Sequence, residues 1–180
     1  MSLGRYAIRV AGKSPLRVGE LGDVPVFVAM RPAGRLWPRM ATQSSNGPRV
    51  GCGVAILRDG KLLLIRRARP PEAGCWSLPG GKVDLWERAE AAARREIAEE
   101  LGVRLGALEL LCVVDYVAPE EGAHWVSPAF LATAFEGEPA LLEPDKHTGL
   151  GWFALDALPG PLALSALEAV EAIQSRNRGP

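Results

Sequence analysis

The sequence is short of three features that would point to particular classes of protein. Its three cysteines, Cys52, Cys75 and Cys112, are odd in number and widely spaced, which argues against a disulfide framework and against a zinc knuckle. No apolar run approaches the roughly 18–20 residues that a membrane-spanning helix needs. The 21 basic and 21 acidic side chains cancel, so no global basic field is available for nucleic acid. These absences predict a cytoplasmic protein that does not enter a membrane.

The composition is that of an ordinary globular chain. Of the 180 residues, 48% are hydrophobic and 23% charged, close to the usual values of roughly 45–50% and 25%, so we expect one folded domain with some chain to spare. Residues 1–48 are that spare chain, a basic, Gly/Pro/Arg-rich segment that ends in a linker with a boundary near Pro48. An accessory hairpin is the favoured interpretation. A basic arm for a polyanion, or upstream sequence before a natural start at Met40, are alternatives.

Apolar patterns and turn residues predict strands and two helices after residue 48. Asp59-Gly60 is a two-residue hairpin signal between the apolar runs 50–57 and 62–67. Gly102 is expected to end the first helix. The other predicted elements are strands at 76–78, 108–117, 125–134 and 152–155, an extended piece at 82–85, and helices at 87–101 and 164–175. Strands with two helices imply an α/β or α+β sandwich.

The first predicted helix concentrates glutamates on one face. At roughly 100° per residue, Glu96, Glu99 and Glu100 fall within about a third of the helix circumference, so their carboxylates are expected to converge. A like-charged pair at i,i+4 costs about 0.2–0.5 kcal/mol on an exposed helix, and more when partly buried. Because Arg95 supplies only one positive charge, the cluster favours Mg²⁺ or Mn²⁺ as a further cation. For the helix alone, a solvated acidic face is the competing interpretation.

The residues around this helix resemble the Nudix hydrolase signature, a Gly, five residues, a Glu, seven residues, and then Arg-Glu-apolar-any-Glu-Glu-any-Gly-apolar. The matching positions are Gly81, Glu87, Arg95, Glu96, Ile97, Glu99, Glu100, Gly102 and Val103. Seven fixed residue types, each at a frequency of roughly 7%, coincide by chance in about one window in 10⁸. The resemblance covers roughly residues 49–180. It implies an αβα sandwich with a mixed β-sheet that hydrolyses a nucleoside diphosphate linked to another group.

The resemblance also implies roles for individual residues. The implied ligands of Mg²⁺ or Mn²⁺ are Gly80, through its carbonyl, and the carboxylates of Glu96, Glu99, Glu100 and Glu143. Glu96 is the first choice for the general base, and Glu99 and Arg95 complete the catalytic set. Arg95 and Glu87 are expected to be structural, Arg95 by holding the acidic face in place and Glu87 by its favourable position near the helix N-terminus.

Substrate contacts are predicted less specifically. Arg67 and Lys82 resemble positions that bind substrate phosphates in the family, although exposed basic residues are usually only solvated. Trp76, Trp125 and His124 are candidates for a nucleobase pocket, with an ordinary structural role as the alternative for each.

The resemblance implies a small-molecule nucleotide as substrate, with nucleoside triphosphates ranked first. ADP-ribose or a nucleotide sugar is the alternative, because Pro119 lies sixteen residues beyond Val103, a spacing similar to a mark of ADP-ribose pyrophosphatases. A nucleotide-sensing regulator without catalysis is an alternative of another class, and decapping of RNA ends is a further one. Nucleic acid is an unexpected partner, left open through residues 1–48, and a homodimer is left open as well.

Overall fold

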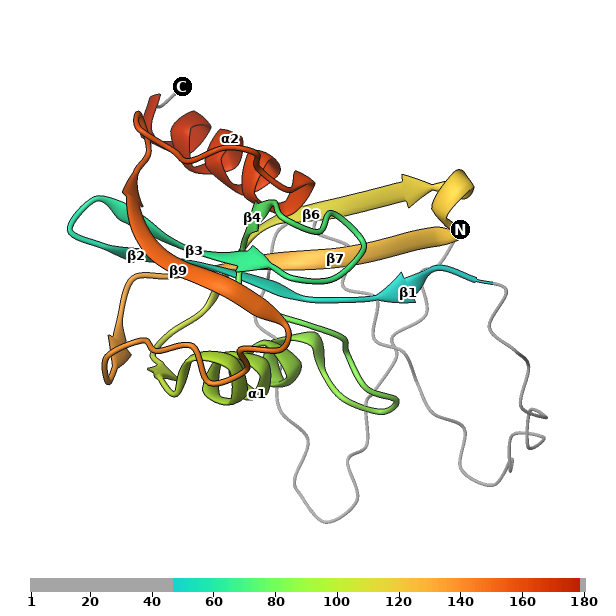
Figure 1. Cartoon of the computed structure of the whole chain (residues 1–180). Coiled ribbons are helices and arrows are strands. Elements are labelled where there is room, and N and C mark those ends of the chain that lie inside the picture. The colour runs from blue at the N-terminus through green and yellow to red at the C-terminus, as the bar shows by residue number, and fades with distance from the viewer. Residues whose placement is uncertain (1–46, 179–180) are drawn as a thin grey trace, which may run out of the picture. The chain divides into compact units, whose positions relative to one another are not determined.

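A seven-stranded mixed sheet forms the centre of the molecule (Figure 1). The structure is a computed structural model that describes residues 47–178, so the predictions for the basic segment, including a start at Met40, lie outside the described residues. The strands of the sheet are β1 (Arg49–Val50), β2 (Gly53–Arg58), β3 (Lys61–Arg67), β4 (Trp76–Ser77), β6 (Glu109–Ala118), β7 (Ala123–Ala132) and β9 (His147–Ala154). β7 runs parallel to β1 and β2, and the other pairs are antiparallel.

Two helices cover opposite faces of the sheet, α1 (Ala89–Leu101) below it and α2 (Leu164–Arg178) above it in Figure 1. Side chains of β2 and β3 alternate between the two faces, as the period of two in a strand requires. Ile56 and Leu63 pack in the core under α1, whereas Ala55 and Leu62 pack in the core under α2. This three-layer arrangement confirms the predicted α+β sandwich with a mixed sheet.

The smaller elements lie outside the main sheet. A two-stranded sheet pairs β5 (Arg104–Leu105) with β8 (Phe135–Glu136), and a short 3₁₀ helix, η1 (Pro119–Glu121), joins β6 to β7. Neither α1 nor α2 combines the length and the apolar character that crossing a bilayer requires.

Helix α1 ends where the sequence predicts and begins two residues later. Gly102 adopts the left-handed conformation (φ 70°), and its N–H caps the helix at the Ala98 carbonyl. At the other end, the Glu87 carboxylate accepts a hydrogen bond from the Asp84 N–H at 3.1 Å, and the Glu87 N–H donates to the Asp84 carbonyl. This local turn competes with the helix for residue 87, so the first helical residue is Ala89.

The strand predicted at 152–155 is longer than expected, running from His147 to Ala154. Gly149 and Gly151 weaken the strand pattern in the sequence. In the structure β9 pairs along the whole length of β3, which supplies the hydrogen bonds that local propensity does not predict. This register pairs His147 with Arg67 and places the start of β9 beside the carboxyl end of β3. The piece expected at 82–85 makes only an isolated bridge between Gly51 and Lys82.

Candidate functional site

A cleft of about 440 Å³ opens between the end of β3, the loop before α1, and the start of β9. Five of the residues predicted for the site line it: Arg67, Gly80, Lys82, Glu96 and Glu100. The other three, Arg95, Glu99 and Glu143, do not line the cleft itself. Arg95 bonds to Glu96 and Glu99, and Glu143 contacts Lys146, which lines the cleft. The structure therefore brings five of the predicted residues to one cleft, and the surrounding contacts show how each group is held.

The Gly80-Gly81 pair lets the loop approach both the sheet and the helix. Gly80 has φ +140°, and a Cβ on it would overlap the Cys52 carbonyl, while a Cβ on Gly81 would overlap the Glu96 carboxyl group. The loop is fastened to the sheet by the Cys52 N–H, which donates to the Gly81 carbonyl at 2.8 Å. On its other side, the Gly80 N–H donates to Glu100 Oε2 at 2.9 Å. Glycine is thus required where backbone and carboxylates come together.

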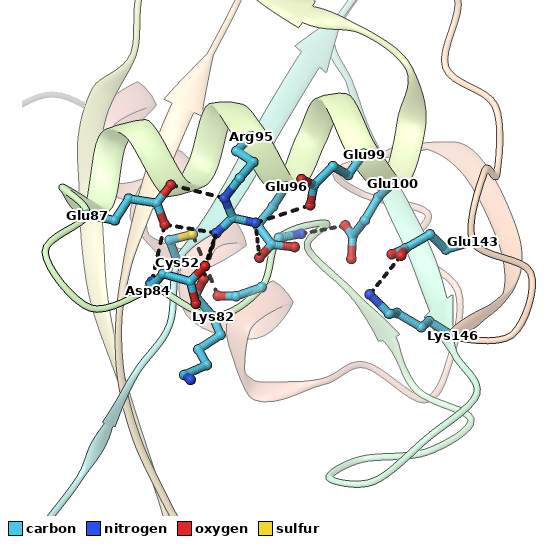
Figure 2. Close-up of polar contacts among 12 residues, drawn as sticks. Cys52, Lys82, Asp84, Glu87, Arg95, Glu96, Glu99, Glu100, Glu143 and Lys146 are labelled. Carbon is cyan, nitrogen blue, oxygen red and sulfur yellow. Dashed lines mark hydrogen bonds and ion pairs between the residues drawn. The ribbon is translucent and has the colours of Figure 1, made fainter. Parts of the chain in front are cut away.

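Arg95 organises one side of the acidic face (Figure 2). Its Nε and Nη2 donate to the two oxygens of Glu87 at 3.0 and 2.9 Å, and its Nη1 donates to Glu96 Oε1 at 2.8 Å and Glu99 Oε2 at 3.1 Å. Nη2 also donates to the Lys82 carbonyl at 3.1 Å. The hydrogen bond from Arg95 lowers the pKa of Glu87, and the bonds to Glu87 and Glu96 raise the pKa of Arg95. Arg95 therefore holds the acidic face together, as expected from the sequence.

Glu100 lies in a different environment on the same helix. It is 2% exposed, and its Oε1 lies 3.5 Å from His147 Nε2. Burial raises its pKa to about 8; the Gly80 N–H opposes that rise, and the charges of Glu96 and Glu143 add to it. A carboxylate in this position is poorly compensated by the protein alone.

Glu143 and His147 complete this second group. One ligand atom each from Glu100, Glu143 and His147 lie within 4.8 Å of one another. Lys146 Nζ contacts Glu143 Oε1 at 2.8 Å and has a raised pKa because of that contact, as Figure 2 shows for the pair. Glu143 Oε2 and His147 Nδ1 are buried and have no hydrogen-bond partner among residues 47–178. Burial and the nearby Arg67 lower the pKa of His147, so its imidazole is held in the neutral form that can ligate a metal.

The three signature glutamates therefore do not meet at one point, as the helical spacing predicted. Arg95 Nη1 bonds to Glu96 and Glu99, whereas Glu100 faces Glu143 and His147. The reason is that Arg95 bonds to Glu96 and Glu99, whereas the Gly80 N–H donates to Glu100 and His147 lies beside it. The donor set still fits a hard divalent cation, because it is rich in carboxylate oxygen and contains an orphaned buried oxygen on Glu143.

The sequence did not single out His147. A lone histidine after a Pro-Asp-Lys turn carries no local signal, and it lies far along the chain from the signature. Only the pairing of β3 with β9 brings it to the cleft.

Some of the residues predicted to contact substrate line the cleft, and others lie outside its lining. Arg67 lines the cleft and donates through Nε to the Pro71 carbonyl at 2.8 Å, and Lys82 is exposed within it. Trp125 also lines the cleft, with its indole N–H buried and lacking a partner in the described part of the chain. Trp76 instead packs edge-on against Phe153 at 4.9 Å between ring centroids.

His124, the third candidate for a nucleobase pocket, lies away from the cleft lining. Its Nε2 is 3.3 Å from Asp115 Oδ1, and its side chain is 43% exposed. The nucleobase candidates named in the sequence therefore reduce to Trp125.

Comparison with known proteins agrees with this geometry. Residues 47–173 match the family described as NUDIX domain. The chain is similar to a MutT NUDIX hydrolase from Burkholderia pseudomallei of known crystal structure, with 59% sequence identity and a TM-score of 0.70 over 71% of this chain and 98% of that one.

Two curated relatives carry enzymatic names. The chain is 33% identical to the CTP pyrophosphohydrolase of Escherichia coli strain K12 over 131 residues, which is 67% of this chain and 87% of that protein. It is 36% identical to the ADP-ribose pyrophosphatase of Methanocaldococcus jannaschii over 112 residues, 62% of this chain. That match spans 65% of the archaeal protein, slightly under two thirds of its length.

Proposed function

The chain belongs to the Nudix hydrolase family, and on that premise we propose that it hydrolyses nucleoside triphosphates to a nucleoside monophosphate and pyrophosphate, with Mg²⁺ or Mn²⁺. The observation that carries the proposal is the single cleft in which the buried carboxylates of Glu96 and Glu100 face the basic side chains of Arg67 and Lys82. Acidic groups there suit a divalent cation, and the basic groups suit the substrate's phosphates.

The proposed ligands of the cation are Glu96, Glu99, Glu100, the Gly80 carbonyl and Glu143. A Mg²⁺ or Mn²⁺ ion among them would neutralise charge on the diphosphate and lower the pKa of a bound water. The raised pKa of Glu100 supports this assignment, because a buried carboxylate with insufficient compensation gains most from an added positive charge. The partnerless oxygen of Glu143 supports it independently.

Glu96 is the proposed general base. It is 9% exposed, lines the cleft, and is oriented by the Arg95 hydrogen bond to its Oε1, which leaves Oε2 to accept a proton. In the proposed step a water oxygen bonds to phosphorus at the bridge between the first and second phosphates. The bridging P–O bond breaks, pyrophosphate leaves with the bridging oxygen, and the water's proton passes to Glu96. Arg95 acts here as a positioning residue.

Substrate binding is assigned to three side chains of the cleft. Arg67 and Lys82 are proposed to contact the phosphates beyond the cleaved bridge, where opposite charge and hydrogen bonding add to affinity. Trp125 is proposed to contact the nucleobase through its ring and its unpartnered indole N–H.

ADP-ribose is the second candidate substrate. The relative from Methanocaldococcus jannaschii is named an ADP-ribose pyrophosphatase, which favours it. Pro119 gives it little support, because this residue begins the 3₁₀ helix η1 and is not part of the cleft lining. The E. coli relative named for CTP covers more of its own length, and it supports the ranking of triphosphates first.

A screen with product identification tests the proposal. The full chain is incubated with Mg²⁺ and, separately, nucleoside triphosphates, ADP-ribose, dinucleotides and nucleotide sugars, and products are identified by ³¹P NMR. We expect a nucleoside monophosphate and pyrophosphate from a triphosphate. AMP and ribose 5-phosphate from ADP-ribose alone would reverse the ranking. Tight nucleotide binding without turnover of any compound would instead favour the sensing regulator.

We also propose a cytoplasmic location, supported by the unpaired state of Cys52, Cys75 and Cys112. Reducing conditions keep thiols in this state, and burial raises the pKa of Cys52 to about 11, which keeps that thiol protonated and unreactive. A homodimer stays a hypothesis, as does any contact of residues 1–48 with nucleic acid. Size-exclusion chromatography with light scattering and a salt-dependent RNA-binding assay test the two.

A further inference from the structure

Three side chains from separate parts of the chain meet at the cleft, which Glu100 and His147 line. Glu100 belongs to α1, Glu143 to the loop before β9, and His147 is the first residue of β9. Glu100 is 2% and His147 5% exposed, and one ligand atom of each of the three lies within 4.8 Å of the others. Only one of the three, Glu100, belongs to the signature helix, so this group is a feature of the folded chain rather than of the motif.

Two members of the group, Glu143 and His147, each keep a buried polar atom without a partner among residues 47–178, and the third, Glu100, has one oxygen in only a long contact. The Gly80 N–H bonds to Glu100 Oε2, so Oε1 is left facing His147 Nε2 at 3.5 Å, beyond the length of a good hydrogen bond. Lys146 bonds to Glu143 Oε1, so Oε2 remains buried and without a partner among residues 47–178. His147 Nδ1 is likewise buried without a partner among residues 47–178, and Nε2 is the ring nitrogen that faces Glu100. Buried polar atoms are normally hydrogen-bonded, so this concentration of exceptions points to a ligand.

The Lys146 ammonium group does not fill the place of a cation bound by all three side chains. Its side chain is 49% exposed, and its ammonium group contacts Glu143 Oε1 only, not Oε2 or Glu100. Lys146 lines the cleft, and a long, half-exposed lysine can swing away from Glu143 towards solvent when a small cation enters. The group would then hold two carboxylates and one neutral imidazole around the same point.

We infer that His147 supplies an imidazole nitrogen to a divalent-cation subsite shared with Glu100 and Glu143, and that this subsite takes a first-row transition-metal ion such as Mn²⁺ in preference to Mg²⁺. Mg²⁺ prefers oxygen ligands and keeps several of its waters, whereas imidazole nitrogen binds transition-metal ions well. The inference rests on the proposed function, since it specifies the cation in the cleft of that hydrolase. It concerns binding, however, and is measured without turnover.

The test uses the full, metal-free chain with Mn²⁺ as the probe. An EPR titration gives the Mn²⁺ dissociation constant, and pulsed EPR of the bound ion detects the nitrogen of a directly coordinated imidazole. His124 is the other of the two histidines in the chain and lies outside the cleft lining, so His124→Asn is the matched control for His147→Asn.

We expect an imidazole nitrogen signal in the wild type and in His124→Asn, and its loss in His147→Asn. Mn²⁺ affinity should fall roughly tenfold in His147→Asn, while Mg²⁺ affinity, measured by competition, changes by less than about twofold. The unchanged Mg²⁺ affinity also shows that the variant is folded.

Bound Mn²⁺ without a nitrogen signal in the wild type would overturn the inference, and this measurement does not depend on how well any variant folds. Equal Mn²⁺ affinity in His147→Asn and the wild type would overturn it too. If the nitrogen signal is absent but the wild type still hydrolyses a nucleotide, the inference fails and the proposed function stands. If the signal is present and no nucleotide is hydrolysed, the proposed function fails and the cation subsite stands.

Discussion

The acidic face of helix α1 holds two neighbouring groups of carboxylates under opposite electrostatic conditions, here called the Arg95 side and the Glu100 side. On one side, Arg95 lies within 2.8–3.1 Å of carboxylate oxygens of Glu87, Glu96 and Glu99. On the other side, Glu100 is almost fully buried, faces His147, and has a pKa raised to about 8. The protein itself largely balances the negative charge on the Arg95 side, whereas it leaves the negative charge of Glu100 largely unbalanced.

This difference separates carboxylates whose charge Arg95 balances in the metal-free protein from one, Glu100, whose charge depends on an added cation. A guanidinium that bonds to three carboxylates stabilises the native helix and loop without any ligand. A buried carboxylate without comparable compensation destabilises the metal-free protein, and such a residue is retained where it has a functional use. The consequences for activity and for stability should therefore run in opposite directions on the two sides.

The largest expected effect is the loss of catalysis when a proposed cation ligand on either side, Glu100 or Glu99, loses its charge. Glu100→Gln should lower kcat for nucleotide hydrolysis by about a thousandfold or more, because it removes a charge that the reaction needs, while the Gly80 hydrogen bond can persist. Glu99→Gln should also lose activity by orders of magnitude. Steady-state assays check both, with Glu90→Gln as the control, since Glu90 on the same helix bonds to Arg94. Normal turnover by both variants would contradict the site assignment.

Stability should respond most strongly on the Arg95 side. Arg95→Met removes the partner of three carboxylates and should lower the free energy of unfolding by about 3–4 kcal/mol, measured by urea denaturation. Arg95→Lys keeps the charge but loses the forked hydrogen bonds, so it should lose a smaller amount. A loss below about 1 kcal/mol for Arg95→Met would show that the network of hydrogen bonds is not what holds the acidic face.

The pH dependence of stability reports on the Glu100 side within the wild-type protein. Burial, with Glu96 and Glu143 nearby, raises the pKa of Glu100 from 4.5 to about 8, opposed by Lys146, while His147 faces it as a neutral group. The folded state therefore binds more protons than the unfolded state between these values, and stability is highest below about pH 4.5 for this group and falls as pH rises towards 8.

We expect the metal-free wild type to lose about 2–3 kcal/mol of unfolding free energy from this group between pH 5 and pH 8, less than the full shift implies because water can enter the cleft. Glu100→Gln should show a flatter profile, measured by urea denaturation at each pH. Parallel profiles for the two proteins would indicate that Glu100 titrates normally.

The smallest expected effects concern substrate affinity. Lys82→Gln and Arg67→Gln should each raise the KM for the nucleotide by roughly tenfold with little change in kcat, because each removes a contact to phosphates that is similar before and during reaction. Lys61→Gln, at the far end of β3, is the control for a general change in charge. If KM rises equally in the control, the effect is not local.

The sequence predicts most of the fold and part of the site, and the division has physical reasons. Asp59-Gly60 and Gly102 are local signals, and both the hairpin and the end of α1 follow them. The beginning of β9 depends on pairing with β3, which no local pattern reveals because glycines interrupt the strand.

Side chains of the site likewise follow from local spacing only in part. The spacing of Glu96, Glu99 and Glu100 correctly places them near one another, but helical geometry alone does not show how Arg95 divides them. His147 enters the cleft through tertiary pairing, so its contribution is visible only in the folded chain.

The central claim is that Glu100 is a buried charge awaiting a divalent cation, and its most direct test is the free energy of unfolding at pH 8 with and without saturating Mg²⁺. The wild type should gain about 2–3 kcal/mol from Mg²⁺, as expected for a ligand near one hundred times its dissociation constant. Glu100→Gln should be more stable than the wild type without Mg²⁺ and gain much less from adding it. An equal gain in both proteins, with no stabilisation of the metal-free variant, would contradict the account.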